Sequence, residues 1–346
     1  MQLHEFMCPE VVATAPGLPD HSEIGAYPSR LVMAYDADTD EVLTRRARFT
    51  LTDATRPTDF GPQKAARRNH PLLLSLKGRV RGSLVADMGD AAPYDTRLYF
   101  DRPRNVIQYN RRRGARSQIL WRLPGYYEPS PSMGGLWGKS VTDDRAFLDK
   151  ESKIVWRGAL SGGCWISPFE KRKVSHHLAV EDILGLAGRF SRPKAVAFSL
   201  DNRAFTDFRI ALKKGDPRLA HRPGVPDIFD LRRHPSFFLK FRYILCPMGH
   251  DVATQLYWVI ATNSIAFKEE GEYEVLPDFF LKPWVHYVPL EQGMPDIREK
   301  FEFCEANLGF CTDMLARAKL AYAEMLEART WEEAENKVLD RLGVLA

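Results

Sequence analysis

A glycine, an imidazole and a carboxylate stand together at Gly249, His250 and Asp251, directly before thirteen uncharged residues. The apolar sequence RYILC (242–246) predicts a buried strand that leads into this triplet, and the uncharged run predicts a helix that begins near Val252. Asp251 is then the expected N-cap residue. The N–H groups of a first helical turn carry a partial positive charge and suit a phosphate. Plain helix capping explains the same residues, and their spacing alone does not separate the two interpretations.

A second candidate phosphate site follows another predicted strand, SKIVWRGALSGG (152–163). The strand ends at Trp156, and Arg157 and a glycine- and serine-rich turn come next. Backbone N–H groups in such a turn can approach a phosphate, and an arginine can bind it in a fork. The sequence is not a Rossmann-type glycine fingerprint, and a tight turn without a ligand is equally compatible with it.

Two carboxylates end a third predicted strand. GSLVADMGD (82–90) is an apolar run whose carboxyl end carries Asp87 and Asp90. Gly89 allows the backbone to turn tightly between them. A carboxylate at the end of a buried strand is a candidate general base.

Metal ligands are a weaker interpretation of the acidic sequence Asp36-x-Asp38-x-Asp40. A calcium loop that starts this way needs glycine at its sixth position and glutamate at its twelfth, where this chain has Glu41 and Ala47. Aspartates between two strand-like runs make a good turn. The sequence therefore predicts a turn here.

Histidines and cysteines do not form a metal site by spacing. His177 and Glu181 lie one helical turn apart beside His176, but no third ligand is evident. Five scattered cysteines without a Cys-x-x-Cys predict reduced thiols and no zinc site. They are Cys8, Cys164, Cys246, Cys304 and Cys311.

Basic residues concentrate in one segment, although the net charge is only +4: residues 97–122 contain eight arginines and one acid. Such a run attracts nucleotide phosphates, phospholipid head groups or nucleic acid, unless it is simply a solvated loop. No recognition-helix, zinc-finger or aromatic RNA-binding signature accompanies it, so no nucleic-acid partner is expected.

The order of the strands and helices that would position these residues indicates an α/β protein. A length of 346 residues exceeds one ordinary core and indicates two domains. Predicted strands alternate with helical segments, which indicates parallel sheets with crossover helices. Residues 124–140 are rich in proline, glycine and serine, as in a linker or active-site loop. No apolar window spans a bilayer and no signal-peptide pattern opens the chain, so a cytoplasmic protein is expected.

Three motifs, in this order, resemble glycosyltransferase family 90, the family of protein O-glucosyltransferases, capsule xylosyltransferases and bacterial lipopolysaccharide-type sugar transferases. They are KIVWRGALSG (153–162), GHDVATQLYWVIATNSIAF (249–267) and FFLKPWVHYVPL (279–290). LKPWVHYVPL is the most specific of them, and the G-x-D-V-A-T form is more similar to the bacterial branch. The resemblance covers roughly residues 80 to 325.

The resemblance implies a GT-B fold, in which two Rossmann-like domains with parallel sheets face each other across a cleft. We expect an acceptor-side domain at 1–150, a nucleotide-sugar domain at 151–325 and a C-terminal helix at 326–346 that packs back on the first domain. It further implies a UDP-sugar donor, an inverting mechanism and no metal. The residues that it assigns to donor binding are Arg157, Gly158, Ala159, Ser161, Arg172, Gly249, His250, Asp251, Val252, Ala253, Thr254 and Gln255.

The family's catalytic aspartate lies in an Asn-x-x-Asp pattern at a strand end, and this assigns the general base to Asp90. Asp87 stands where asparagine is usual and is the rival carboxylate. A second departure is Gln255, where animal members have an arginine. Glutamine cannot neutralise a diphosphate, so either Arg157 or Arg172 supplies the charge or the donor preference differs.

The expected function is transfer of a sugar of the glucose or xylose class from UDP to a hydroxyl of a glycan or glycolipid, such as lipopolysaccharide or capsule. One alternative is a non-catalytic nucleotide- or carbohydrate-binding protein on the same fold, which Gln255 favours. Another is an anion-binding scaffold in which residues 97–122 contact an anionic membrane surface at its inner face. The sequence names neither the sugar nor the acceptor.

Overall fold

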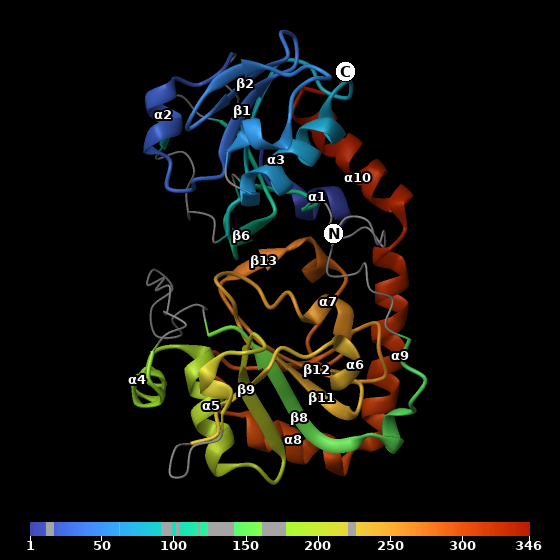
Figure 1. The fold of residues 1–346 in the computed structure, drawn as a ribbon. Coiled ribbons are helices and arrows are strands. Elements are labelled where there is room, and N and C mark those ends of the chain that lie inside the picture. The colour runs from blue at the N-terminus through green and yellow to red at the C-terminus, as the bar shows by residue number, and fades with distance from the viewer. Residues whose placement is uncertain are drawn as a thin grey trace. The chain divides into compact units, whose positions relative to one another are not determined.

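The computed structural model contains two compact units, each built around one six-stranded sheet (Figure 1). Unit 1 comprises Met1–Gly135, Tyr273–Phe280 and Met325–Ala346, and unit 2 comprises Leu136–Glu272 and Leu281–Glu324. The predicted α/β class with two separate sheets is thus confirmed. The residues described are 1–11, 17–61, 63–90, 99–101, 104–116, 118–123, 142–160, 178–220 and 226–346.

The sheet of unit 1 is mixed, with the strand order β3-β2-β1-β4-β5-β7. The pairs among β3, β2, β1 and β4 are antiparallel, whereas β4, β5 and β7 are parallel to one another. Only this second half has the parallel arrangement that the sequence predicted for the whole sheet. The strands are β1 (Val32–Asp36), β2 (Glu41–Thr44), β3 (Arg48–Thr50), β4 (Ser83–Asp87), β5 (Val106–Gln108) and β7 (Gln118–Leu120).

The acidic sequence 36–40 forms the β1–β2 turn, as predicted. Asp36 Oδ1 accepts hydrogen bonds from the N–H groups of Asp38 and Thr39 at 3.0 and 3.3 Å. Asp38 Oδ1 accepts one from Gly82 N–H at 2.9 Å, and Asp40 accepts one from the Tyr35 hydroxyl at 2.7 Å. The carboxylates therefore bind groups within the turn, in β1 and beside β4.

In the described part of unit 1, four α-helices accompany the sheet, together with a two-stranded sheet of β6 (Asn110–Arg112) and β13 (Tyr273–Val275). The C-terminal helix is fastened through the buried carboxylate of Glu335, which pairs with Arg79 at 3.2 Å and Arg122 at 2.5 Å. The helices are α1 (Leu3–Met7), α2 (His21–Ala26), α3 (Gln63–Leu76) and α10 (Ala328–Arg341).

The sheet of unit 2 is fully parallel, with the strand order β10-β9-β8-β11-β12-β14. Its central strands are apolar and buried, as expected for a parallel sheet covered on both faces. The strands are β8 (Glu151–Gly158), β9 (Thr206–Leu212), β10 (Phe229–Leu231), β11 (Phe241–Cys246), β12 (Ile265–Glu269) and β14 (Val288–Leu290).

The chain order places a topological switch point between β8 and β11. From β8 the chain continues to β9 and β10 on one side, and it then returns to add β11, β12 and β14 on the other. The helices of this unit are α4 (Val180–Gly185), α5 (Ser191–Asp201), α6 (Pro235–Phe238), α7 (Leu256–Val259), α8 (Ile297–Ala306) and α9 (Leu308–Met325).

The prediction of a helix that begins near Val252 is wrong in the position of its start and in its length. Helix α7 has four residues, and Gln255 rather than Asp251 occupies its N-cap position. Asp251 Oδ1 accepts a hydrogen bond from Val252 N–H at 2.6 Å, and the carboxylate of Glu269 accepts one from Met248 N–H at 2.7 Å. Because these backbone donors are satisfied in a loop, the segment does not need helical hydrogen bonds.

Candidate active site

The candidate site of unit 2 lies at the carboxyl ends of β8 and β11. Arg157 and Gly158 end β8, and the loop from Pro247 to Gln255 follows β11. In open α/β sheets, ligands bind outside the carboxyl ends of the strands at the switch point. The first two motifs of the sequence analysis thus meet at the position where this fold binds ligands.

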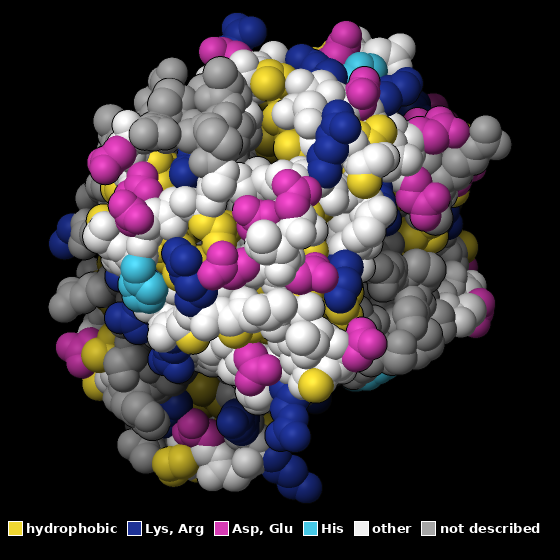
Figure 2. All heavy atoms as spheres, turned by 90° about the horizontal axis from the view of Figure 1, so that it is seen from above, with side chains coloured by type: hydrophobic (Ala, Val, Ile, Leu, Met, Phe, Trp, Pro, Cys, Tyr) yellow, Lys and Arg dark blue, Asp and Glu magenta, His cyan; other side chains and the backbone are white. Residues whose placement is uncertain are grey.

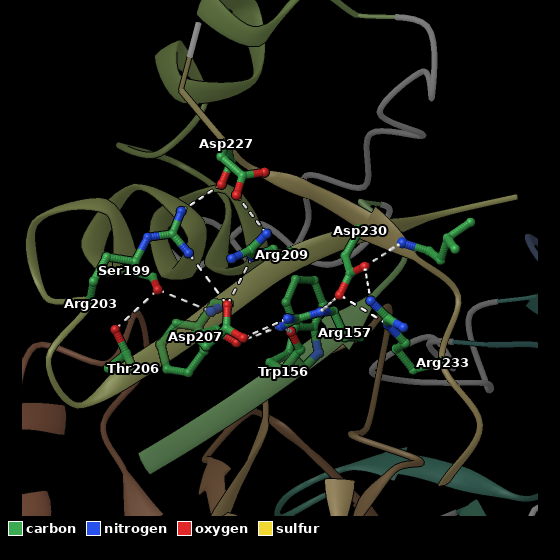
Figure 3. Close-up of polar contacts among 12 residues, drawn as sticks. Trp156, Arg157, Ser199, Arg203, Thr206, Asp207, Arg209, Asp227, Asp230 and Arg233 are labelled. Carbon is green, nitrogen blue, oxygen red and sulfur yellow. Dashed lines mark hydrogen bonds and ion pairs between the residues drawn. The ribbon is translucent and has the colours of Figure 1, made fainter. Parts of the chain in front are cut away.

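Arg157 is not exposed in this site, because its guanidinium binds neighbouring carboxylates and carbonyls (Figure 3). It binds Asp230 through Nε at 2.5 Å and Asp207 through Nη2 at 2.6 Å. Its Nη1 donates to the carbonyls of Trp156 and Asp207 at 2.8 and 2.7 Å. With 3% of its side chain exposed, Arg157 ties β8 to β9 and β10. This geometry favours a structural role over the predicted phosphate clamp.

The sequence analysis missed Arg192, the second residue of α5. Its Nη1 donates to the carbonyl of Ala159 at 2.9 Å, and its guanidinium lies 5.9 Å from the Trp156 ring centroid. Removal from water lowers its pKa to about 10, against the attraction of Glu269 and Asp251. Arg192 therefore stays charged at neutral pH. The signal in the sequence is its place at the start of α5, the helix that precedes β9.

The predicted loop residues lie beside Arg192. A Cβ atom on Gly249 would lie 3.0 Å from the Val252 carbonyl oxygen and 3.5 Å from Arg192 Nη2, so this close approach favours glycine. Asp251 is buried, and Nε2 of Gln255 is also buried, with no hydrogen-bond partner among the described residues. Of the other predicted residues, Gly249 and Ala253 are buried, whereas His250, Val252, Thr254 and Gln255 are partly exposed.

The turn after β8 is described only at its beginning. A Cβ atom on Gly158 would lie 2.5 Å from the Trp156 ring, so the indole covers this position closely. Ala159 is exposed and presents its carbonyl to Arg192. Ser161 and Arg172 lie outside the described residues, as do His176 and His177.

The candidate base of unit 1, Asp90, follows β4 and is held by cations. Arg68 Nη1 and the Tyr109 hydroxyl donate to Oδ1 at 2.9 and 2.8 Å, and Lys64 pairs with Oδ2. Lys64 and Arg68 are one turn apart on α3, while Tyr109 directly follows β5. Burial on its own would raise the pKa of Asp90, but Arg68 and Lys64 outweigh it and hold this pKa well below its usual range.

The rival carboxylate, Asp87, is 1% exposed and belongs to the interior of unit 1. Its Oδ1 accepts a hydrogen bond from Gly89 N–H at 2.8 Å, and burial raises its pKa. A Cβ atom on Gly89 would lie 2.2 Å from Ser29 Oγ, so glycine is required by close packing. Asp90, with 27% of its side chain exposed, is the more accessible of the two carboxylates.

The arginines of the segment 97–122 that the structure describes do not form one surface patch. Arg104, Arg111 and Arg112 are buried, and Arg111 pairs with Glu274 at 2.6 Å. Arg122 is held by Glu335, as described above. On the face shown in Figure 2, cationic and acidic side chains are interspersed. Both interpretations of this segment, the anion-attracting run and the solvated loop, are therefore wrong for Arg104, Arg111 and Arg112, which are buried in unit 1. Arg122 is partly exposed and paired with Glu335.

Two features of the described residues bear on metals and membranes. No group of three or more histidine, cysteine, aspartate or glutamate side chains within these ranges is placed to hold a metal ion. No helix in the same ranges has the length and apolar character needed to cross a bilayer. The four cysteines that the structure describes, Cys8, Cys246, Cys304 and Cys311, are buried free thiols, as predicted for reduced cysteines.

Comparison with known proteins finds short, distant matches to sugar transferases. The chain is 35% identical over 89 residues to O-glucosyltransferase LpsA of Dichelobacter nodosus and 33% identical over 79 residues to protein O-glucosyltransferase 2 of Danio rerio. These matches cover 25% and 22% of this chain. An uncharacterized protein, 035R of Invertebrate iridescent virus 3, is 27% identical over 197 residues, or 56% of this chain.

The matches span only part of these relatives: 27% of LpsA, 15% of protein O-glucosyltransferase 2 and 17% of the viral protein. No protein-family model matches the chain. The relationship recognised in the three motifs is nevertheless confirmed at this distance, and the chain is a distant homologue of the O-glucosyltransferases of glycosyltransferase family 90.

Proposed function

We propose that the protein is an inverting glycosyltransferase that moves a sugar of the glucose or xylose class from UDP to a hydroxyl of a glycan or glycolipid. The observation that carries this proposal is the carboxyl edge of the unit 2 sheet. There the loop Gly249–Gln255, which matches the family's donor loop, meets Arg192 at the switch point between β8 and β11. The distant homology to O-glucosyltransferases supports the reaction class.

In this proposal Arg192, not Arg157, provides the positive charge for the diphosphate. The leaving UDP gains negative charge as the bond from C1 to its oxygen breaks, and a preorganised cation stabilises that charge. Arg157 is already ion-paired with Asp207 and Asp230 and its side chain is 3% exposed, so binding a phosphate would require its guanidinium to move away from both carboxylates. Arg172 remains a further proposed contact. Gln255 contributes an amide N–H₂ group, which can donate to a phosphate or sugar oxygen without charge.

Asp90 is the proposed general base. It would accept the proton of the acceptor hydroxyl as that oxygen attacks C1, and such catalysis typically contributes roughly 10²–10⁴-fold. A carboxylate held by two cations is a weak base. We therefore expect the acceptor to displace Lys64, whose side chain is 48% exposed, while Arg68 and Tyr109 keep Asp90 in place.

A non-catalytic, UDP- or carbohydrate-binding protein is the second candidate. The specific observation that favours it is the neutralisation of Asp90 by Lys64 and Arg68, which lowers its basicity. Such a protein would bind UDP at the same loop but would not transfer sugar.

Calorimetric titration with UDP in EDTA, followed by a panel of UDP-sugars, tests the proposal. We expect binding without a divalent metal, and stabilisation of about 2.7 kcal/mol when free UDP is 100 times Kd. Donor hydrolysis or transfer by the bound protein separates the enzyme from the non-catalytic alternative. Absence of UDP binding with and without Mn²⁺ contradicts both, and binding only with Mn²⁺ contradicts the metal-free site.

A further inference from the structure

One buried carboxylate, Glu269, joins three segments at the carboxyl edge of the unit 2 sheet. It is the last residue of β12 and is 2% exposed. Its Oε2 accepts a hydrogen bond from Met248 N–H at 2.7 Å. Its Oε1 accepts one from Gly293 N–H at 2.8 Å and one from the Ser191 hydroxyl at 2.6 Å. The donors come from the loop after β11, the turn after β14 and the first residue of α5.

These attachments set the position of both parts of the proposed donor site. Met248 directly precedes Gly249, where the predicted donor loop begins. Ser191 directly precedes Arg192, and the charges of Arg192 and Glu269 attract each other. The chain just after Glu269 also packs against the loop, because a Cβ atom on Gly271 would lie 2.7 Å from Met248 Sδ.

We propose that Glu269 is the positioning residue of the donor site, which holds the Gly249–Gln255 loop and Arg192 in the geometry that binds UDP without touching UDP itself. This rests on the proposed function. An ionised carboxylate only accepts hydrogen bonds and has about four lone-pair sites, so it can satisfy three donors at once. A glutamine would direct an N–H₂ donor at one of these donors. Holding a binding loop before the ligand arrives lowers the entropic cost of binding.

The test compares Glu269→Gln with a matched control, Glu305→Gln. Glu305, like Glu269, is a carboxylate that accepts several hydrogen bonds: one from the Tyr243 hydroxyl at 2.6 Å and one from the Arg242 guanidinium at 3.0 Å. These partners lie at the start of β11, the opposite edge of the same sheet. Both variants replace a bonded carboxylate by an amide, so both are expected to lose stability. Only Glu269→Gln should weaken UDP binding, by about tenfold or more, since charge-assisted bonds are lost.

Amide hydrogen exchange without ligand gives a second readout. Glu269→Gln should raise exchange in peptides that cover 248–255, whereas Glu305→Gln should not. If Glu269→Gln does not fold, Ser191→Ala decides, because it removes one of the three bonds and should weaken UDP binding by roughly threefold.

The inference is overturned if Glu269→Gln or, in its place, Ser191→Ala binds UDP like the parent. It is equally overturned if Glu305→Gln loses as much affinity as Glu269→Gln, because global destabilisation then explains both. If the parent does not bind UDP, the proposed function fails. In that case the exchange of 248–255 still shows whether Glu269 holds the loop.

Discussion

At the carboxyl ends of the strands, the charged side chains of the two units are arranged in opposite ways. At the carboxyl ends of β4 and β5 in unit 1, a carboxylate, Asp90, is held by two cations, Lys64 and Arg68. At the carboxyl ends of β8 and β11 in unit 2, a cation, Arg192, is attracted electrostatically by two carboxylates, Glu269 and Asp251. The first arrangement keeps a carboxylate ionised, and the second keeps an arginine charged but compensated. A transferase needs a proton acceptor and an anion binder, and each arrangement can supply one of them.

A second contrast lies within unit 2, between Arg157 and Arg192. Both lie near the end of β8, but Arg157 has two carboxylates in direct contact, whereas Arg192 donates to a carbonyl and lies over the Trp156 ring. The difference indicates that charge near a strand end is not sufficient to identify a ligand-binding residue. The two arginines are distinguished by the residues that each contacts.

The largest effect is expected from Asp90→Asn, which tests the unit 1 side of the comparison. Asparagine keeps the shape but cannot take the proton, so transfer should fall by roughly 10²-fold or more. UDP affinity should stay near the parent value. Transfer rates and UDP titration on purified variants measure both quantities. Asp87→Asn is the companion variant, and an active Asp90→Asn beside an inactive Asp87→Asn would reverse the assignment.

Arg157→Met should act on stability more than on binding. Removing Arg157 takes the most buried partner from Asp207 and Asp230, which keep Arg209 and Arg233. We therefore expect a loss of unfolding free energy at or below the low end of the about 3–5 kcal/mol typical when one partner of a buried ion pair is removed. Urea denaturation gives this free energy, and UDP affinity is measured where the variant is still folded. A variant that is as stable as the parent but no longer binds UDP would restore Arg157 as the phosphate ligand.

Arg192→Gln should have the converse profile. It keeps a hydrogen-bond donor but loses the charge, which is worth roughly 1.5–3 kcal/mol in a charge-assisted bond and corresponds to about a tenfold to hundredfold weaker UDP affinity. Stability should fall by less than in Arg157→Met, since Glu269 loses the attraction of Arg192 but keeps its three hydrogen bonds. Calorimetry and thermal unfolding on the same samples provide the comparison. Unchanged affinity would remove Arg192 from the site.

The smallest effect is expected from Lys64→Met. Because the folded-state pKa of Asp90 is depressed, its ion pairs stabilise the protein above the unfolded carboxyl pKa of about 4, and this contribution is lost as the pH falls through the lower folded-state value. Lys64 is half exposed, so its share is at most about 1 kcal/mol at pH 7. The difference from the parent should shrink below about pH 4. Urea denaturation at several pH values checks this, and a difference that grows in acid would show the wrong sign.

The sequence predicted those parts of the fold that depend on local patterns. Buried strands such as 83–87 and 241–246 are mainly apolar, and the 36–40 turn follows from aspartates between two strand-like runs. The antiparallel half of the first sheet was not predicted, because alternation of strands and helices does not fix strand direction at a sheet edge.

The candidate site was less predictable, since its partners are distant in sequence. Nothing near Arg157 indicates that Asp207 and Asp230 will neutralise it across two strands. Arg192 stands 33 residues after Ala159, and only folding brings their side chain and carbonyl together. The loop after β11 is likewise held by Glu269, 21 residues beyond Met248.

The central claim is that the switch-point edge of unit 2 binds UDP, and hydrogen exchange with saturating UDP tests it most directly. The account predicts slower exchange in peptides that cover 157–160, 189–195 and 247–256. It predicts no change at the amino edge of the same sheet, in 281–287 and 303–310. Slower exchange confined to other segments, in a sample that calorimetry shows to be saturated with UDP, would contradict the account.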